Sequence, residues 1–83
     1  MYIHLGENTV VRDDEVIGIF DLETTTVSKH TRDFLGESEK RKEVINVSYE
    51  LPKSFILCSK GKNKKRVYIS QISSTTLFKR SGI

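Results

Sequence analysis

The chain has 83 residues, a formal net charge of +3 and an isoelectric point near 9.1, which limits it to one small domain spanning residues 1–83. One cysteine, Cys58, excludes an intramolecular disulfide, and two histidines are too few for a usual four-ligand zinc site without carboxylates. Hydrophobic residues make up only 36% of the sequence, and a domain of this size buries only about 60% of its extended surface, so we expect stabilisation by self-association into a homo-oligomer.

The N-terminal segment predicts a β-hairpin. Residues 2–5 alternate in polarity, with Ile3 and Leu5 on one face of a strand. Residues 6–8, Gly-Glu-Asn, favour a turn, and the apolar residues of 9–12 can return as the second strand.

Residues 15–22 are the most hydrophobic strand candidate of the chain. Apolar side chains fall on both faces of this strand, so we expect a central position in the sheet with cover on both sides. The acidic triplet at 13–15 is a poor metal site, because neighbouring carboxylates in a turn point apart and further oxygen ligands are needed.

A medium-length helix is predicted from about Ser28 to Lys42. Val27, Phe34 and Leu35 fall at helical spacing and predict its apolar stripe. The three cations at 40–42 lie near the negative pole of the helix dipole, and we assign them to that stabilising role.

The following segment, 43–49, predicts a strand that carries Ile45, Val47 and Tyr49 on one face. Pro52 ends this segment, because proline has no backbone N–H to donate to a sheet.

The C-terminal part predicts two more strands, 53–59 and 66–70, and a short helix within 72–80. A serine at 73–74 is expected to cap that helix, and Leu77 is expected to face inward. The fold class is therefore α+β, with a mostly antiparallel sheet of about five short strands, one medium helix and a short C-terminal helix.

Residues suited to catalysis are sparse. His4 lies opposite the apolar face of its strand, His30 falls in the first turn of the predicted helix, and Cys58 lies in an apolar strand where a thiol acts as a small hydrophobic group. The sequence contains neither a phosphate-binding P-loop nor a Gly-x-Ser-x-Gly pattern. We therefore expect no enzymatic activity, no metal and no cofactor.

Positive charge is concentrated at residues 59–70, with the sequence SKGKNKKRVYIS. Residues 1–43 hold ten acids and six bases, for a net charge of −4, whereas residues 44–83 hold one acid and eight bases, for a net charge of +7. Gly61 and Asn63 tolerate left-handed turn geometry, so the stretch is predicted to be a hairpin tip. The tip carries five cations: Lys60, Lys62, Lys64, Lys65 and Arg66.

Two interpretations of this hairpin tip remain open. A flexible basic tip can contact the phosphate backbone of duplex DNA. Binding of single strands is disfavoured, because no aromatic residue is interleaved with the cations. Alternatively, a lysine-rich turn keeps the protein soluble and prevents edge-to-edge association of sheets.

Targeting features are absent from the sequence. The first residues show neither a basic segment nor the apolar segment of a signal peptide. No apolar run approaches the ~20 residues of a membrane helix. We expect a cytoplasmic protein with no membrane partner, in agreement with its single free thiol.

Five short segments, in the same order along nearly the whole chain, together resemble the bacterial extracellular matrix regulator family, B type (RemB-like). They are MYIHLG at 1–6, VVR at 10–12, VIGIFD at 16–21, KSFIL at 53–57 and YISQISSTTLFKR at 68–80.

The resemblance implies a small cytoplasmic protein whose A-type (RemA) paralogues bind promoter DNA and activate biofilm matrix genes. It also implies an antiparallel sheet with helices and assembly into rings, which repeat a modest basic surface and so gain avidity. We therefore expect a homo-oligomeric, DNA-binding transcriptional regulator. Its expected phosphate contacts are Lys60, Lys62, Lys64, Lys65 and Arg66, with Arg12, Lys53, Lys79 and Arg80 as outer helpers.

The arginines that contact DNA in the A type do not carry over. That type places consecutive arginines after a Tyr-Gly pair, and the corresponding positions here hold Leu51 and Pro52, preceded by Glu50. Lys53 is the cation that remains nearby, and Glu15 stands at another basic position of the A type. The alternative is therefore a ring-forming interaction module that does not bind DNA itself and that associates with an A-type paralogue or another acidic protein.

Overall fold

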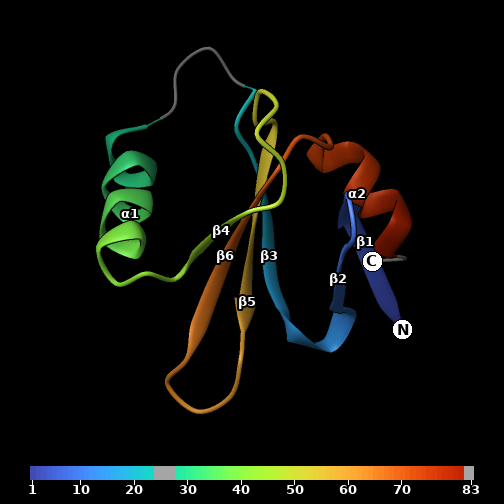
Figure 1. Ribbon diagram of the computed structural model, residues 1–83, viewed down its shortest axis with the longest axis horizontal. Helices are drawn as coiled ribbons and strands as arrows, with labels where there is room; N and C mark the ends of the chain where they lie inside the picture. Colours follow the sequence, from blue (N-terminus) through green and yellow to red (C-terminus); the bar gives the residue numbers. More distant parts are fainter. Residues whose placement is uncertain (24–27, 82–83) are drawn as a thin grey trace.

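The computed structural model describes residues 1–23 and 28–81, and within these residues it contains two sheets and two α-helices (Figure 1). A two-stranded sheet consists of β1 (Tyr2–Gly6) and β2 (Thr9–Arg12), followed by a 3-10 turn, η1 (Asp13–Glu15). The second sheet has the spatial order β3 (Val16–Asp21), β5 (Ser54–Ser59), β6 (Lys65–Ser70) and β4 (Val44–Asn46). The helices are α1 (Lys29–Lys40) and α2 (Ser74–Ser81). The α+β prediction is confirmed.

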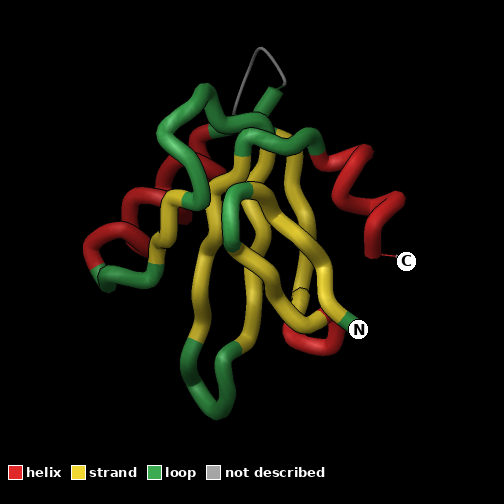
Figure 2. Tube along the Cα trace, turned by 45° about the vertical axis from the view of Figure 1, so that its right-hand side comes forward, coloured by secondary structure: helices red, strands yellow, loops and turns green. Residues whose placement is uncertain are grey.

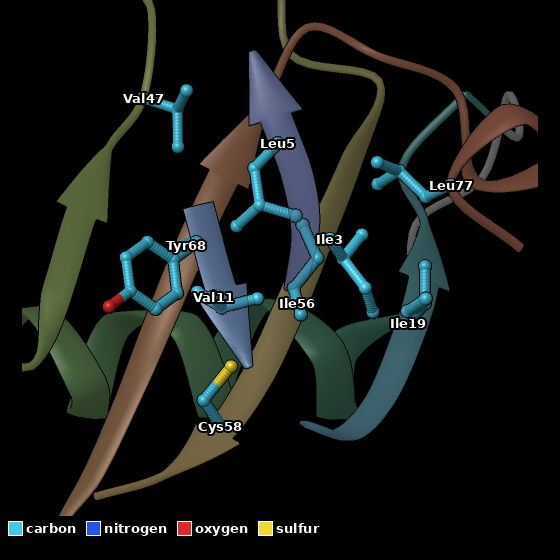
Figure 3. Close-up of a cluster of buried hydrophobic side chains, with 9 residues drawn as sticks. All are labelled: Ile3, Leu5, Val11, Ile19, Val47, Ile56, Cys58, Tyr68 and Leu77. Atoms are coloured by element: carbon cyan, nitrogen blue, oxygen red, sulfur yellow. The ribbon is translucent and has the colours of Figure 1, made fainter. Parts of the chain in front are cut away.

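The four-stranded sheet separates two layers. The β1–β2 hairpin and α2 pack on one face, whereas α1 lies on the other, where Phe34 is 6.0 Å from the Phe55 ring (Figures 1 and 2). The main core fills the space between the hairpin, α2 and the sheet (Figure 3). Its members are Ile3, Leu5, Val11, Ile19, Val47, Ile56, Cys58, Tyr68 and Leu77.

Alternation in β1 places its side chains as the sequence predicts. Ile3 and Leu5 are buried, whereas His4 is exposed and its Nε2 lies 2.9 Å from the backbone oxygen of Glu7. Ser70, buried in β6, donates its hydroxyl to the backbone oxygen of Leu5 at 2.6 Å. This bond satisfies a buried carbonyl and ties the hairpin to the four-stranded sheet.

The prediction of a central position for β3 is wrong. This strand pairs with β5 and forms an edge of the sheet. Val16 and Ile19 pack toward the core, whereas Phe20 stacks on Phe55 at 4.8 Å on the α1 face and remains 43% exposed. A register shift between Val16 and Gly18 turns Ile17 outward. The apolar residues on both faces of β3 therefore indicate that each face of this edge strand is partly covered, not that the strand is central.

The strand predicted at 43–49 is also shorter than expected. β4 ends at Asn46, and Val47 is buried, but the Tyr49 side chain is fully exposed. The backbone turns away after Val47, where the Ser48 hydroxyl accepts a hydrogen bond from the N–H of Glu50. β4 runs parallel to β6, although the other pairs of this sheet are antiparallel.

Both helices begin as predicted, α1 after Ser28 and α2 after the serine cap at 73. The Ser28 hydroxyl accepts the N–H of Thr31 at 3.2 Å, and the Ser73 hydroxyl accepts the N–H of Thr76 at 3.3 Å. Leu77 of α2 is completely buried, as predicted. Val27, which was predicted to belong to the apolar stripe of α1, lies outside the described residues. No helix in the described part of the chain is long and apolar enough to cross a membrane.

Candidate nucleic-acid interface

The basic stretch forms the connection between β5 and β6, so the predicted hairpin tip is confirmed (Figure 2). The N–H of Lys60 donates to the Lys64 carbonyl at 2.9 Å and closes the loop. Gly61 and Asn63 have φ values of 109° and 62°, in the left-handed region that glycine and asparagine tolerate best. The turn residues thus place the cations at one end of the sheet.

Lys60 differs from the other cations of the tip, because the fold already pairs its charge. Its Nζ lies 3.3 Å from the Glu15 carboxylate and 5.7 Å from the centroid of the Tyr68 ring. Burial acts to lower the pKa of the Lys60 ammonium, but hydrogen bonds to Glu15 and Tyr68 outweigh it and raise this pKa. Lys60 therefore fixes the base of the hairpin against η1.

The remaining four cations define the basic tip: Lys62, Lys64, Lys65 and Arg66. All four side chains are exposed. Within residues 1–23 and 28–81, no acidic side chain lies within ion-pair distance of them. Their positive charges are therefore compensated by solvent and counterions, which an incoming polyanion can displace.

Lys42 joins this surface, although its place in the sequence predicts only a role at the end of α1. Parallel pairing of β4 with β6 places Val44 opposite Val67, and the N–H of Val67 donates to the Glu43 carbonyl at 2.9 Å. The residues after α1 therefore lie beside the start of β6. Together with the β5–β6 hairpin, these residues border an open hollow of about 370 Å³. It is lined by Lys42, Glu43, Ile45, Lys60, Asn63, Lys64, Lys65 and Arg66. Local sequence identifies Lys42 as a cation near a helix end, but its neighbours depend on strand pairing.

Of the four predicted outer helpers, two have partners within the fold and a third lies at the opposite end of β5 from the tip. Arg12 donates to the Asp14 carboxylate at 2.7 Å, and Arg80 donates to the His4 carbonyl at 3.0 Å, so both have partners within the fold. Lys53 precedes β5, at the opposite end of this strand from the tip. Lys79 is exposed on α2.

The loop at the position of the A-type arginines is also distant from the tip. It connects β4 to β5 and lies at the other end of the sheet (Figure 1). Tyr49 is 100% exposed and Leu51 is 81% exposed, so the loop presents apolar side chains instead of cations. A DNA surface built on the basic tip is therefore a different region of the molecule from the one that the A-type pattern implies.

Cys58 lies on β5, the strand that leads into the basic hairpin, and is completely buried. Burial raises the pKa of its thiol from 9.0 to about 11; nearby Lys60 opposes this increase and Glu15 adds to it. The thiol is therefore protonated at neutral pH and is a core group, as its apolar strand predicts.

This pKa shift predicts a loss of stability at alkaline pH. Between pH 9 and 11 the unfolded chain releases the Cys58 proton while the folded chain retains it, so the free energy of unfolding falls as the pH rises. The Cys58→Ala variant is expected to show a shallower decrease, by at most about 1.4 kcal/mol per pH unit. Urea unfolding at several pH values measures both slopes, and the other titrating groups are the same in both proteins. Identical slopes would contradict the assignment.

Comparison with known proteins assigns this chain to a family. The family described as RemA-like, extracellular matrix regulatory protein A-like, matches residues 2–80. The chain is also 37% identical over 81 residues to extracellular matrix regulatory protein B of Bacillus subtilis (strain 168), a match that covers 98% of this chain and 90% of that protein. Both matches cover nearly the whole chain, which is therefore a RemB-type member of the RemA-like family of extracellular matrix regulatory proteins.

Proposed function

We propose that this protein is a cytoplasmic, DNA-binding transcriptional regulator of extracellular matrix and biofilm genes that acts as a homo-oligomer. The name of the Bacillus subtilis relative supports the regulatory role. The observation that carries the DNA-binding proposal is the basic tip, where four exposed cations have no acidic partner among the described residues. In this proposal the tip contacts the phosphate backbone of duplex DNA and positions the protein without reading bases.

Self-association makes such a weak contact useful. One tip offers few charges, but copies linked in a ring present several tips to one duplex and gain avidity without new contacts. An apolar surface supports this part of the proposal. Phe20 and Ile17 are exposed on β3, an edge strand of the sheet. Beside Phe20 lies an open, mostly apolar hollow of about 210 Å³, lined by Phe20, His30, Thr31, Phe34, Phe55 and Leu57.

Fluorescence anisotropy with a labelled promoter duplex tests the proposal. If one tip neutralises about four phosphates, the logarithm of affinity should fall against the logarithm of salt concentration with a slope of about −4 per engaged tip. Light scattering on the same sample gives the assembly state.

Failure to bind at low salt would overturn the DNA-binding proposal. It would favour the alternative, an interaction module that associates with an A-type paralogue. The replacement of the A-type arginines by Leu51 and Pro52 is the observation that favours this second candidate.

A further inference from the structure

The hollow beside the basic tip has the properties of a small-ligand site. We propose that it binds one small polyphosphate, the chemistry shared by a nucleoside polyphosphate and a short inorganic polyphosphate. The site shares Lys64, Lys65 and Arg66 with the proposed DNA surface. It stands whether or not the protein binds DNA.

Two parts of the chain, the α1–β4 connection and the β5–β6 hairpin, converge on this hollow. Lys42 follows α1 with a φ of 59°, and its N–H donates to the Glu39 carbonyl at 2.9 Å. Glu43 donates its N–H to the Ser38 carbonyl, and its own carbonyl accepts from Val67 of β6. The second part is the β5–β6 hairpin, whose base is held by the ion pair between Lys60 and Glu15. The hollow is therefore bounded by hydrogen-bonded backbone and not by an isolated loop.

The charge of the lining favours an anion. The lining holds five cations, of which Lys60 is already paired with Glu15, and one carboxylate, that of Glu43, which lies 3.8 Å from the Arg41 guanidinium. Four cations of the lining therefore remain unpaired among the described residues. Lysine ammonium groups act as point charges toward phosphate, and an arginine such as Arg66 can donate two parallel hydrogen bonds to one phosphate group. Like charges drawn together by the fold repel each other, and a bound polyanion relieves that repulsion.

Size and composition narrow the ligand class. The volume of about 370 Å³ lies at the lower end of the range of ligand pockets, roughly 300–1,000 Å³. The lining cations come from two segments, the α1 end and the hairpin, so a chain of phosphates can contact more of them than a single phosphate can. The lining residues include no aromatic side chain on which a base could stack. Recognition is therefore directed at the phosphates.

Isothermal titration calorimetry of the full chain with inorganic tripolyphosphate tests the proposal. We expect one tripolyphosphate per chain and weaker binding by Lys42→Gln, about three- to tenfold, because one charge-assisted contact is lost. Lys62→Gln is the matched control, since Lys62 carries the same charge and lies on the β5–β6 hairpin next to the hollow, but does not line it. It should change the dissociation constant by less than about twofold.

A second pair of variants, one test and one control, examines a predicted gain of tripolyphosphate affinity instead of a loss. Glu43→Gln removes the one carboxylate of the lining and should tighten tripolyphosphate binding by about two- to fivefold. Glu50→Gln changes the net charge equally at the other end of the sheet and should leave binding unchanged. Thermal unfolding of all four variants verifies that they are folded.

Two results would overturn the proposal: absence of tripolyphosphate binding, or equal weakening by Lys42→Gln and Lys62→Gln, which would show a diffuse charge effect. A parallel titration with a nucleoside triphosphate distinguishes the two sources. Equal affinity means that the phosphates alone are recognised, whereas tighter binding means that the nucleoside also contributes. These titrations contain no DNA, so their failure is distinct from failure of the proposed regulatory function.

Discussion

Reversing the charges of Lys64 and Lys65 together is expected to weaken binding to duplex DNA at least about 100-fold at physiological salt. Both side chains belong to the basic tip, are exposed and have no acidic partner among the described residues. Losing two charge-assisted phosphate contacts costs about 3 kcal/mol, which corresponds to about two orders of magnitude in affinity. The salt dependence should also become roughly half as steep, because two of about four neutralised phosphates are lost.

The matched control for this double variant is Lys29→Glu combined with Lys53→Glu. It changes the net charge by the same amount, but Lys29 begins α1 and Lys53 precedes β5, at the end of the sheet opposite the tip (Figure 1). We expect the control to retain most of the affinity and the steep salt dependence. Exposed substitutions of this kind change stability by only about 0.5 kcal/mol, so thermal unfolding should be similar for both proteins.

Either of two outcomes would contradict the tip assignment. Equal weakening by both double variants would mean that binding depends on net charge or on the surface around Lys53, and not on the tip alone. Unchanged binding by Lys64→Glu/Lys65→Glu would remove the basic tip from the interface and would leave its cations as a solvated turn that discourages sheet association.

Local features of the fold could be predicted from the sequence because they depend on neighbouring residues. Alternation placed Ile3 and Leu5 in the core, and the conformational tolerance of Gly61 and Asn63 located the hairpin tip. Strand order could not be predicted in the same way. The apolar residues of β3 look the same in the sequence whether they are covered by the chain itself or left partly exposed at an edge.

The candidate site was predictable only in part for the same reason. The sequence shows that Lys60 is a cation, but its pairing with Glu15 follows from the β3–β5 register, in which Val16 lies opposite Cys58. Lys42 reaches the hollow because β4 runs parallel to β6, and a three-residue strand gives little indication of its direction. Charge composition thus locates a basic region, whereas long-range pairing decides which charges are available.

Replacing Phe20 by glutamate is expected to dissociate the proposed homo-oligomer into monomers. The Phe20 ring lies over Gly18, where the Cβ of any larger residue would come within 2.7 Å of the ring, and it stacks on Phe55 while remaining 43% exposed. In a single chain a glutamate here keeps access to water, so the fold should persist. In an interface that covers this surface, the carboxylate would be buried without a partner, at a cost of several kcal/mol.

Tyr49→Glu is the matched control, because Tyr49 is another aromatic residue, is completely exposed and lies in the β4–β5 loop instead of on the edge strand β3. Size-exclusion chromatography with light scattering should show monomers for Phe20→Glu and the wild-type assembly for Tyr49→Glu, with circular dichroism verifying that both are folded. The reverse pattern would place the interface at the loop, and a monomeric wild type would remove self-association from the proposal. Because a Phe20→Glu monomer keeps its basic tip intact, its DNA affinity should fall through lost avidity alone, by about 100-fold or more. The same variant therefore separates the charge of one tip from the effect of repeating it.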